Sequence, residues 1–511
     1  MAKLEKKSSG KYTVPQEIRD IPRPVSTEVK RTGGNRYYVY EIRHEVIDNK
    51  RKKITGPCIG QIVSGIGFVQ NSNYLRSAKA SVFDYGQYAV ALKCSESVLA
   101  LLCKHFNEID AYTIYLFALI QVVNSYTGVT QIQTYFNKSF LSLIYPTISL
   151  SYYKLSNLLE DIARKEEAPI SFQQELLDRA CEIAVDGHVI KTSSKKSGLS
   201  SFGYKYPIIQ SEQMNLLMAY DTKNKNPVFA KMFPGNELDK TSFTELLQRF
   251  NYSNLLITID RGFYSEENLE DINDYKCKYI IPLSENLKDY KAITKDQKFT
   301  GEFLYKTNKH SARVFYKEET IKKEDNSTYK VYLFKNVDEN NRLCTSYLEN
   351  LSEGRKGYTQ DTYNKLSQWF GTIVLRTNDL AKEAKDIFNS YKRRWNIETY
   401  YDYLKNDYDF NDLQSEDNYQ IQGMCFITLV AGLIHSELKK VIPNYKNYNI
   451  GKFLLEVGNV HLSKEYGTWQ LKNILNEQNE MLKTVGIDYI TEIIELNKKI
   501  KDIETSGVLD K

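Results

Sequence analysis

The chain has 511 residues, of which 41% are hydrophobic and 26% are charged, a balance typical of a folded protein with more than one domain. The longest apolar run in its C-terminal third covers residues 425–434, far fewer than the roughly 20 residues that span a bilayer. The first residues contain no apolar segment typical of a secretory signal. We therefore expect neither a membrane protein nor a secreted one.

The net charge of +5 is unevenly distributed along the chain. Residues 1–60 contain 14 Lys and Arg against 7 Asp and Glu, which gives 14 − 7 = +7 and leaves 5 − 7 = −2 for the remainder. A basic end on a nearly neutral body suits a polyanionic partner, and it equally suits a solvated tail.

Metal-binding residues give a clearer expectation. The seven cysteines are scattered with no CxxC pair, and the six histidines show no metal-binding spacing. A disulfide framework or a zinc site is therefore not expected, and the cysteine usage fits a reducing cytoplasm. A catalytic metal in this chain would be held by carboxylates, the ligands that Mg²⁺ and Mn²⁺ prefer.

The N-terminal third divides into a polar arm, a β unit and a helical region. Residues 1 to about 35 are polar and contain three prolines, whereas residues 36–70 alternate as strands do, around a predicted turn at 48–56. Arg51, Lys52 and Lys53 at this turn could contact phosphate or only keep the turn soluble. From residue 82 to 180 apolar positions recur every three or four residues, which predicts helices.

Residues 181–283 predict an α/β core. Three strands, expected at 181–191, 215–221 and 227–233, form an antiparallel meander. A helix, a strand at 254–260, a second helix and a strand at 277–283 are expected after it. Asp186 lies within the first of these strands and Asp260 ends the fourth. Each aspartate precedes a turn-like sequence, so a structural role is open for each one alone.

The segment 284–375 contains alternating stretches joined by polar turns, which predicts a β-rich insertion. Residues 379–406 contain neither Pro nor Gly, and we expect one long helix there with Asn378 or Asp379 as its N-cap. Buried and amphipathic helices are expected at 420–442 and 448–496.

The helix at 379–406 carries an unusual polar face. At about 100° per residue, Tyr391, Arg394, Glu398 and Lys405 fall within an arc of roughly 60°. This face suits phosphates around a metal ion, and an ordinary Arg394–Glu398 pair on a solvated surface remains the alternative.

The spacing Tyr-x2-Arg-x3-Glu-x6-Lys resembles the Y-R-E-K signature of cut-and-paste insertion-sequence transposases, of the insertion-sequence-four-like kind, with an RNase H-like catalytic core. The resemblance extends over residues 181–442. It implies that Asp186, Asp260 and Glu398 form a metal-binding DDE triad with Mg²⁺ or Mn²⁺, two ions in all. It also implies that Tyr391, Arg394 and Lys405 contact phosphates of the DNA end.

The resemblance further implies a DNA transposase that binds terminal inverted repeats as a homodimer, cleaves a strand and joins the freed 3′-OH to target DNA, in the nucleoid of a prokaryotic cytoplasm. A nuclease without strand transfer and a catalytically silent DNA-binding derivative are the alternatives. Trp395, Tyr400, Tyr401 and Tyr403 could stack on an unpaired base or pack against the sheet.

The expected fold class is α/β, an RNase H-like core with a β-rich insertion, preceded by a small β unit and a helical domain. The expected divisions are the basic arm and β unit 1–80, a helical DNA-end-binding domain 81–180, the first part of the core 181–283, the β-rich insertion 284–375, the completion of the core with the signature helix 376–442, and a C-terminal helical region 443–511.

Overall fold

The computed structural model describes residues 13–32, 36–47, 50–70, 82–125, 127–192, 194, 196–203, 212–237, 239–252, 254–296, 298–307, 311–325, 327–406, 412–413, 415–465 and 468–506. The chain separates into two compact units, Met1–Ser81 and Val82–Lys511. Each unit has its own hydrophobic core.

The first unit is a four-stranded antiparallel sheet in the order β1-β2-β3-β4, preceded by the single-turn helix α1. Its core consists of Tyr37, Val39, Ile59 and Ile62. The predicted turn at 48–56 was placed too broadly, because Arg51, Lys52 and Lys53 pair with β2 as part of strand β3. The elements are α1 Gln16–Arg19, β1 Thr27–Thr32, β2 Arg36–Ile47, β3 Lys50–Val63 and β4 Gly67–Gln70.

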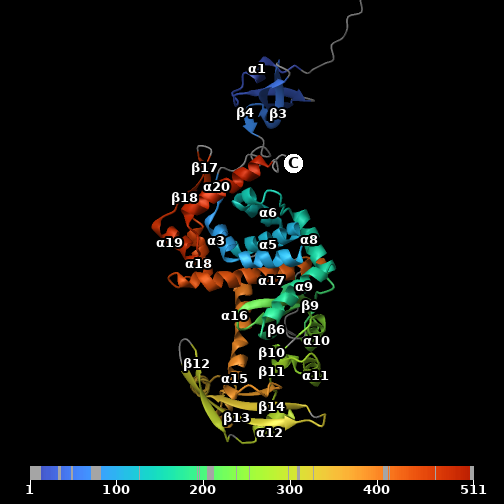
Figure 1. The fold of residues 1–511 in the computed structure, drawn as a ribbon, viewed down its shortest axis with the longest axis vertical. Coiled ribbons are helices and arrows are strands. Elements are labelled where there is room, and N and C mark those ends of the chain that lie inside the picture. Colours follow the sequence, from blue (N-terminus) through green and yellow to red (C-terminus); the bar gives the residue numbers. More distant parts are fainter. Residues whose placement is uncertain are drawn as a thin grey trace, which may run out of the picture. The chain divides into compact units, whose positions relative to one another are not determined.

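The second unit begins with a short strand and a helical region (Figure 1). The predicted helical periodicity at 82–180 is confirmed, since apolar side chains at that spacing fill a common core. These elements are β5 Val82–Asp84, α3 Gly86–Cys94, α4 Glu96–His105, α5 Glu108–Val123, α6 Val129–Lys138, α7 Leu141–Ile144, α8 Tyr152–Arg164 and α9 Glu167–Arg179.

A large mixed sheet follows, with strand order β12-β13-β14-β15-β11-β10-β6-β8-β7, while β9 pairs with β8 and β16 with β6. The antiparallel meander β6-β8-β9 and the later strands β10 and β11 form as predicted. Strands β6, β10 and β11 run parallel to one another. The elements are β6 Glu182–Thr192, β7 Ser201–Phe202, β8 Glu212–Asp221, β9 Asn226–Pro234, α10 Asp239–Arg249, β10 Leu256–Ile259, η1 Arg261–Phe263, α11 Glu266–Asp274 and β11 Lys278–Pro282.

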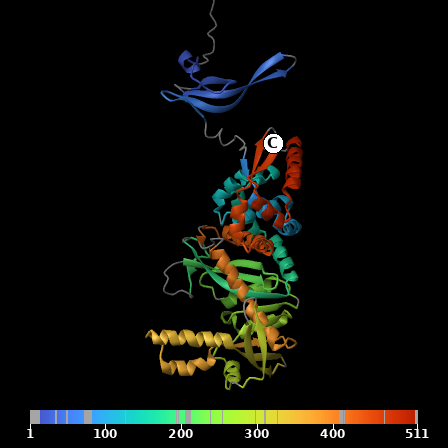
Figure 2. The ribbon, with the colours of Figure 1, turned by 90° about the vertical axis from the view of Figure 1, so that its left-hand side faces the viewer.

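The insertion extends this sheet rather than forming a separate layer. Strand β15 pairs with β11 on one side and with β14 on the other, so the core and the insertion share one continuous ladder. Two helices, α13 and α14, were not predicted, and Figure 2 shows the pair projecting beside the sheet. The elements are α12 Lys288–Ile293, β12 Gly301–Lys306, β13 Ser311–Lys322, β14 Thr328–Asn336, α13 Val337–Ser352, α14 Gln360–Leu366, η2 Ser367–Trp369 and β15 Thr372–Thr377.

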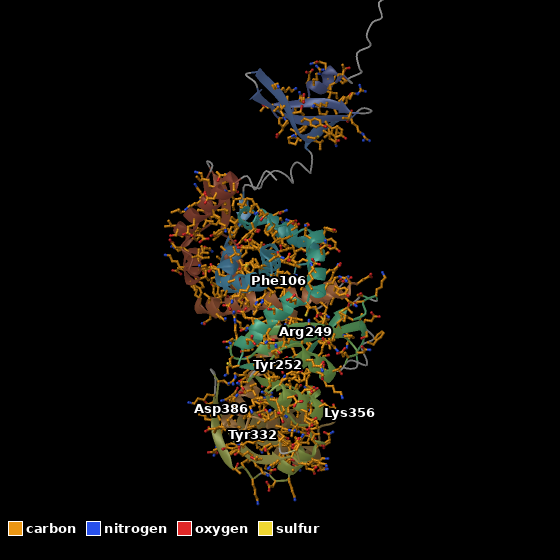
Figure 3. The ribbon with its side chains drawn as sticks, turned by 45° about the vertical axis from the view of Figure 1, so that its right-hand side comes forward. Phe106, Arg249, Tyr252, Tyr332, Lys356 and Asp386 are labelled. Carbon is orange, nitrogen blue, oxygen red and sulfur yellow. The ribbon has the colours of Figure 1, made fainter. Side chains whose placement is uncertain are left out.

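Helix α17 (Asn418–Val441) joins the helical region to the sheet (Figure 1). A β-carbon at Gly423 would lie 2.2 Å from the carbonyl oxygen of Leu159, so only glycine lets α17 and α8 approach this closely. On the other side of α17, the Gln422 side chain accepts a hydrogen bond from the backbone N–H of Met232 in β9 (3.1 Å) and donates one to the backbone carbonyl of Met232 (2.6 Å). In the helical layer, the ring centroid of Phe106, which Figure 3 labels, lies 5.6 Å from that of Phe426 in α17.

Among the described residues, α17 is the one helix long and apolar enough to cross a membrane by length and composition, and 89% of its most apolar window is buried inside the protein. The buried part of this helix extends beyond the apolar run at 425–434, because Gly423 and Met424 before the run and Ser436 and Leu438 after it are also buried. Burial on nearly all sides is the behaviour of a core helix.

The C-terminal region contains a hairpin, β17 and β18, within residues 448–496, where the sequence pattern predicted helices. Strand β17 pairs with β5, so the two ends of the second unit form a three-stranded sheet. The remaining elements are α15 Ala384–Arg393, α16 Trp395–Asn406, β16 Asp412–Leu413, η3 Ile442–Asn444, α18 Ile450–Val457, β17 His461–Glu465, β18 Thr468–Lys472, α19 Asn476–Thr484 and α20 Tyr489–Thr505.

Candidate active site

The first two aspartates lie side by side on neighbouring strands. Strands β6 and β10 are parallel, and the last paired residues are Val185 and Ile259, so Asp186 and Asp260 follow at the same level. Adjacent strands are about 4.8 Å apart, which places these two residues close together. Leu256 of β10 belongs to a cluster separate from that of Val185 and Ile259. Because side chains alternate along a strand, Asp260 lies on the same face as Leu256, and Asp186 at the same level of β6 shares that face.

Helix α15 covers the face that carries Leu256. Ile387 and Phe388 pack with Leu256 of β10 and Ile280 of β11 in a separate core cluster. Tyr332 of β14 belongs to the same cluster, and Figure 3 labels it together with Asp386 of α15. The face that carries the two aspartates is therefore the one on which α15 and α16 lie.

The expected single helix over 379–406 is two helices. Arg394 separates α15 from α16, with the i→i−3 bonds Arg394 N–H to Tyr391 O (3.1 Å) and Ile397 N–H to Arg394 O (3.0 Å) on either side. The predicted N-cap was also wrong, because Glu383 occupies that position. The Asn378 side chain instead accepts a bond from Tyr279 N–H (2.8 Å).

Arg394 brings the third carboxylate to the two aspartates. Its Nη2 donates to Oε1 of Glu398 at 2.6 Å, and its Nη1 lies 3.8 Å from Oδ2 of Asp186. The Arg394 side chain is 9% exposed, and within the described residues its Nε has no hydrogen-bond partner. A buried cation thus lies among three acidic groups from three separate elements.

The acidic groups act on one another. Burial raises the pKa of the Asp186 carboxyl to about 6, and the negative charges of Asp260 and Glu398 add to this rise. Arg394 and the backbone N–H of Gly187 oppose it, the latter by donating to Oδ1 at 2.9 Å. A carboxyl kept partly protonated near neutral pH by burial and like charges is typical of a functional site.

Tyr391 completes the same cluster. Its ring centroid lies 5.8 Å from the Arg394 guanidinium carbon. Burial raises the pKa of the Tyr391 phenol, and the charges of Asp260 and Glu398 raise it further, while Arg394 lowers it. Lys405 lies in the last turn of α16 and is exposed. Five of the six predicted site residues are thus brought together, and Lys405 lies on the same helix as Glu398, about 10 Å further along.

The aromatic residues of α16 divide into two groups. Tyr400 and Tyr401 are buried, and Tyr401 donates to the backbone carbonyl of Asp186 at 2.7 Å, so these two pack against the sheet. His188 stacks on Tyr401 at 4.8 Å between ring centroids, as a neighbour of the site. Trp395, next to Arg394, is 64% exposed.

A second acid–arginine pair, which was not predicted from the sequence, lies next to the first. Arg393 donates to the carboxylate of Glu182 through Nε (2.9 Å) and Nη2 (2.7 Å), and Glu182 also accepts from Ser390 and Thr222. Glu182 is 1% exposed, and it lies four residues before Asp186 on the same face of β6. The position of Glu182 at the start of a buried strand was the available signal.

The donor set fits a divalent metal by its chemistry, since three carboxylates from separate elements are the ligands of Mg²⁺ and Mn²⁺. Within the residues that the structure describes, no group of three or more His, Cys, Asp or Glu side chains is arranged so that it could hold a metal ion. Arg394 makes the contact to Glu398 that a cation would make. Asp186, Asp260 and Glu398 are the residues that would hold a metal here.

Comparison with known proteins assigns the family. The family described as Transposase DDE domain matches residues 178–433, which is half of the chain, and the protein belongs to this family. Its members cut and transfer DNA. No curated protein sequence matches this chain.

Among solved structures, the chain is similar to the piggyBac transposase in its synaptic complex with hairpin DNA, determined by cryo-electron microscopy. The two are 12% identical, the match covers 69% of this chain and 70% of that chain, and the TM-score is 0.36.

Proposed function

We propose that this protein is the cut-and-paste transposase of an insertion sequence, of the insertion-sequence-four-like kind, with an RNase H-like core. It binds the terminal inverted repeats of its element, hydrolyses one strand to free a 3′-OH, and joins that hydroxyl to target DNA. It acts as a homodimer on paired ends, in the nucleoid of a prokaryotic cytoplasm. The observation that carries the proposal is the meeting of Asp186, Asp260 and Glu398 around Arg394.

The sheet supports the RNase H-like assignment. Strands β9, β8 and β6 are antiparallel, and β10 and β11 continue from β6 in parallel. This is the order of strands expected for such a core. Asp186 and Asp260 lie side by side where the parallel pairing of β6 with β10 ends.

In the proposed reaction Asp186, Asp260 and Glu398 would hold Mg²⁺ or Mn²⁺, which would supply activation of the attacking oxygen and stabilisation of the leaving oxygen. Burial first, and then the charges of Asp260 and Glu398, raise the pKa of Asp186, and a bound divalent cation would offset the repulsion among the three carboxylates. Arg394 leaves Glu398 for a phosphate oxygen of the DNA end, where its fork can form two bonds.

Tyr391 donates its phenol hydrogen to the same phosphates. Burial and the nearby acids keep this phenol protonated, because they raise its pKa. Trp395 is exposed beside Arg394 and offers its ring to an unpaired base, whereas Tyr400 and Tyr401 are held in the core.

Substitution of the triad tests the proposal. Each of Asp186→Ala, Asp260→Ala and Glu398→Ala is expected to lower Mg²⁺-dependent cleavage of an inverted-repeat substrate by on the order of 10³-fold or more while DNA binding persists. A variant that keeps near-normal cleavage removes its residue from the triad. A strand-transfer assay with pre-cleaved ends separates a transposase from a nuclease, because only the former joins the 3′-OH to target DNA.

Lys405→Ala tests the phosphate-binding face. Loss of one phosphate contact is expected to lower the slope of log affinity against log salt concentration by about 0.9, because one fewer counterion is released. Lys440→Ala, at an exposed lysine in the last turn of α17, is the matched control. A slope unchanged in both variants excludes a phosphate contact at Lys405.

A further inference from the structure

A polar groove lies between the edge strand of the insertion and the helix that precedes the candidate active site. It is formed by β12 and α15 with the start of α16, and its volume is about 490 Å³. Figure 1 shows β12 and α15 as neighbours in the lower part of the second unit. The lining residues are Leu304, Tyr305, Lys306, Lys385, Asn389, Lys392, Arg393 and Asn396.

The groove has a defined wall on each side. Lys385, Asn389, Lys392 and Asn396 are spaced by four, three and four residues, so they form one stripe along the helices. On β12, Tyr305 packs its ring against Phe388 of α15 at 5.3 Å between centroids, which fixes the strand against the helix.

The groove is strongly cationic. Within the part of the chain that the structure describes, Lys306, Lys385 and Lys392 form no ion pair, while Arg393 is held by Glu182. Burial lowers the pKa of Lys392, while the negative charge of Glu339 raises it. Three acids outside the lining act on the groove: Glu339 on Lys392, and Glu182 and Asp386 on Arg393. Three lysine charges and two amide side chains thus face one cavity.

The groove is separate from the candidate active site. On α15, Ile387 and Tyr391 pack against the sheet, and Tyr391 lies beside Arg394 at the carboxylate cluster. Lys385, Asn389 and Lys392 lie roughly opposite them around the helix axis. A helix with its side chains is about 10–12 Å across, so a strand of DNA at the carboxylates can continue onto the groove within one or two nucleotides.

We propose that this groove is a second DNA site, which binds the phosphodiester backbone of the strand that leaves the active site. The proposal rests on the proposed function, since it names a further part of the DNA path. Lysine ammonium groups supply charge for phosphate oxygens, and the Asn389 and Asn396 amides supply hydrogen bonds to phosphate or sugar. A cavity without an acidic lining side chain favours a polyanion over a protein or a neutral ligand.

The test replaces the three lysines together, as Lys306→Gln, Lys385→Gln and Lys392→Gln, in the full chain. Binding of a fluorescent DNA duplex with a single-stranded extension is measured over a range of salt concentrations. The salt slope is expected to fall by about 2 to 3, and the affinity by about 10- to 100-fold. Replacement of the same lysines by arginine retains the charge and is expected to retain both values.

The control replaces Lys288, Lys291 and Lys295 by glutamine. These exposed lysines are on and just after α12, which packs on the opposite face of the sheet through Ile293, so the change in net charge is the same. Equal DNA binding by the groove variant and this control overturns the proposal. Thermal unfolding of both variants shows whether a loss of binding reflects misfolding. If the triple variant is misfolded, the single variant Lys385→Gln, at an exposed side chain, tests the proposal, and its salt slope is expected to fall by about 0.9.

The result also separates the groove from the proposed function. A wild-type protein that neither binds nor cleaves DNA contradicts the proposed function itself. A wild-type protein that cleaves DNA, with a groove variant as active and as salt-dependent as the control, contradicts the groove alone.

Discussion

Two neighbouring arginines on the helices above the sheet have opposite environments. Arg393 is bound by Glu182, whose carboxylate accepts bonds from Arg393, Ser390 and Thr222. Burial would raise the pKa of Glu182, and these bonds hold it below its usual value. The pair therefore stabilises the folded protein.

Arg394 lies in a less complete arrangement. It bonds to Glu398 but remains 3.8 Å from Asp186, and its Nε has no partner among the described residues. The pKa of Asp186 is raised to about 6, in contrast to that of Glu182. Two acids four residues apart on one strand thus differ in kind: Glu182 is satisfied by the fold, and Asp186 is left for a ligand to satisfy.

The largest expected effect of this contrast is on stability, in the variant Glu182→Gln. This substitution removes the charge from a buried acid but leaves Arg393 in place. It is expected to lower the free energy of unfolding by about 2–3 kcal/mol, and the effect is no larger because the Arg393 side chain is 36% exposed. Denaturant unfolding measures this. Glu96→Gln, in the exposed pair with Lys93, is the control and should leave stability unchanged. Equal stability of the two variants would show that the Glu182 pair is not a structural anchor.

Asp186→Asn is expected to change the free energy of unfolding in the opposite direction. A neutral amide removes a buried charge next to Asp260 and Glu398, so the free energy of unfolding at neutral pH should rise by about 1–2 kcal/mol while cleavage is lost. Asp221→Asn tests whether any buried acid of the sheet behaves this way. Its carboxylate accepts bonds from Lys223 and Asn224, and this variant should lose stability. A loss of stability in Asp186→Asn as well would refute the contrast.

Much of this arrangement follows from local sequence pattern. Alternation and strand order predicted that Asp186 and Asp260 lie on core strands, and their parallel pairing then sets them side by side. Helix α13 was missed, although Asn336 with Glu339 three residues later is an N-cap signal, since the Asn336 side chain accepts from Glu339 N–H at 3.1 Å.

Long-range pairing accounts for the rest. The break at Arg394 has no Pro or Gly to announce it, and no local pattern predicts that Arg394 bonds Glu398 beside Asp186. The groove joins Lys306 to Lys385, 79 residues apart along the chain (385 − 306), through the pairing of the insertion with the core sheet. Periodicity within a window of 10 to 20 residues does not contain such information.

The smallest expected effect is the pH dependence of the same contrast, and it distinguishes the two acids by sign. Because the folded pKa of Asp186 is raised from 3.8 to about 6, the folded protein binds more protons than the unfolded one between these values. The Asp186 contribution to stability is therefore fully present below about pH 4 and is lost as the pH rises through about 6. The stability gained in Asp186→Asn should accordingly be largest above pH 6 and shrink toward zero near pH 4.

Glu182 behaves in the opposite way, because its pKa is lowered in the folded protein. Its contribution is present above its usual value of 4.5 and is lost only as the pH falls through the lower folded pKa. The stability difference between wild type and Glu182→Gln should therefore stay constant from pH 8 to about pH 5, where that of Asp186→Asn already declines. Unfolding curves of the three proteins across this range measure both slopes, and parallel slopes would show that Asp186 and Glu182 share one environment rather than two.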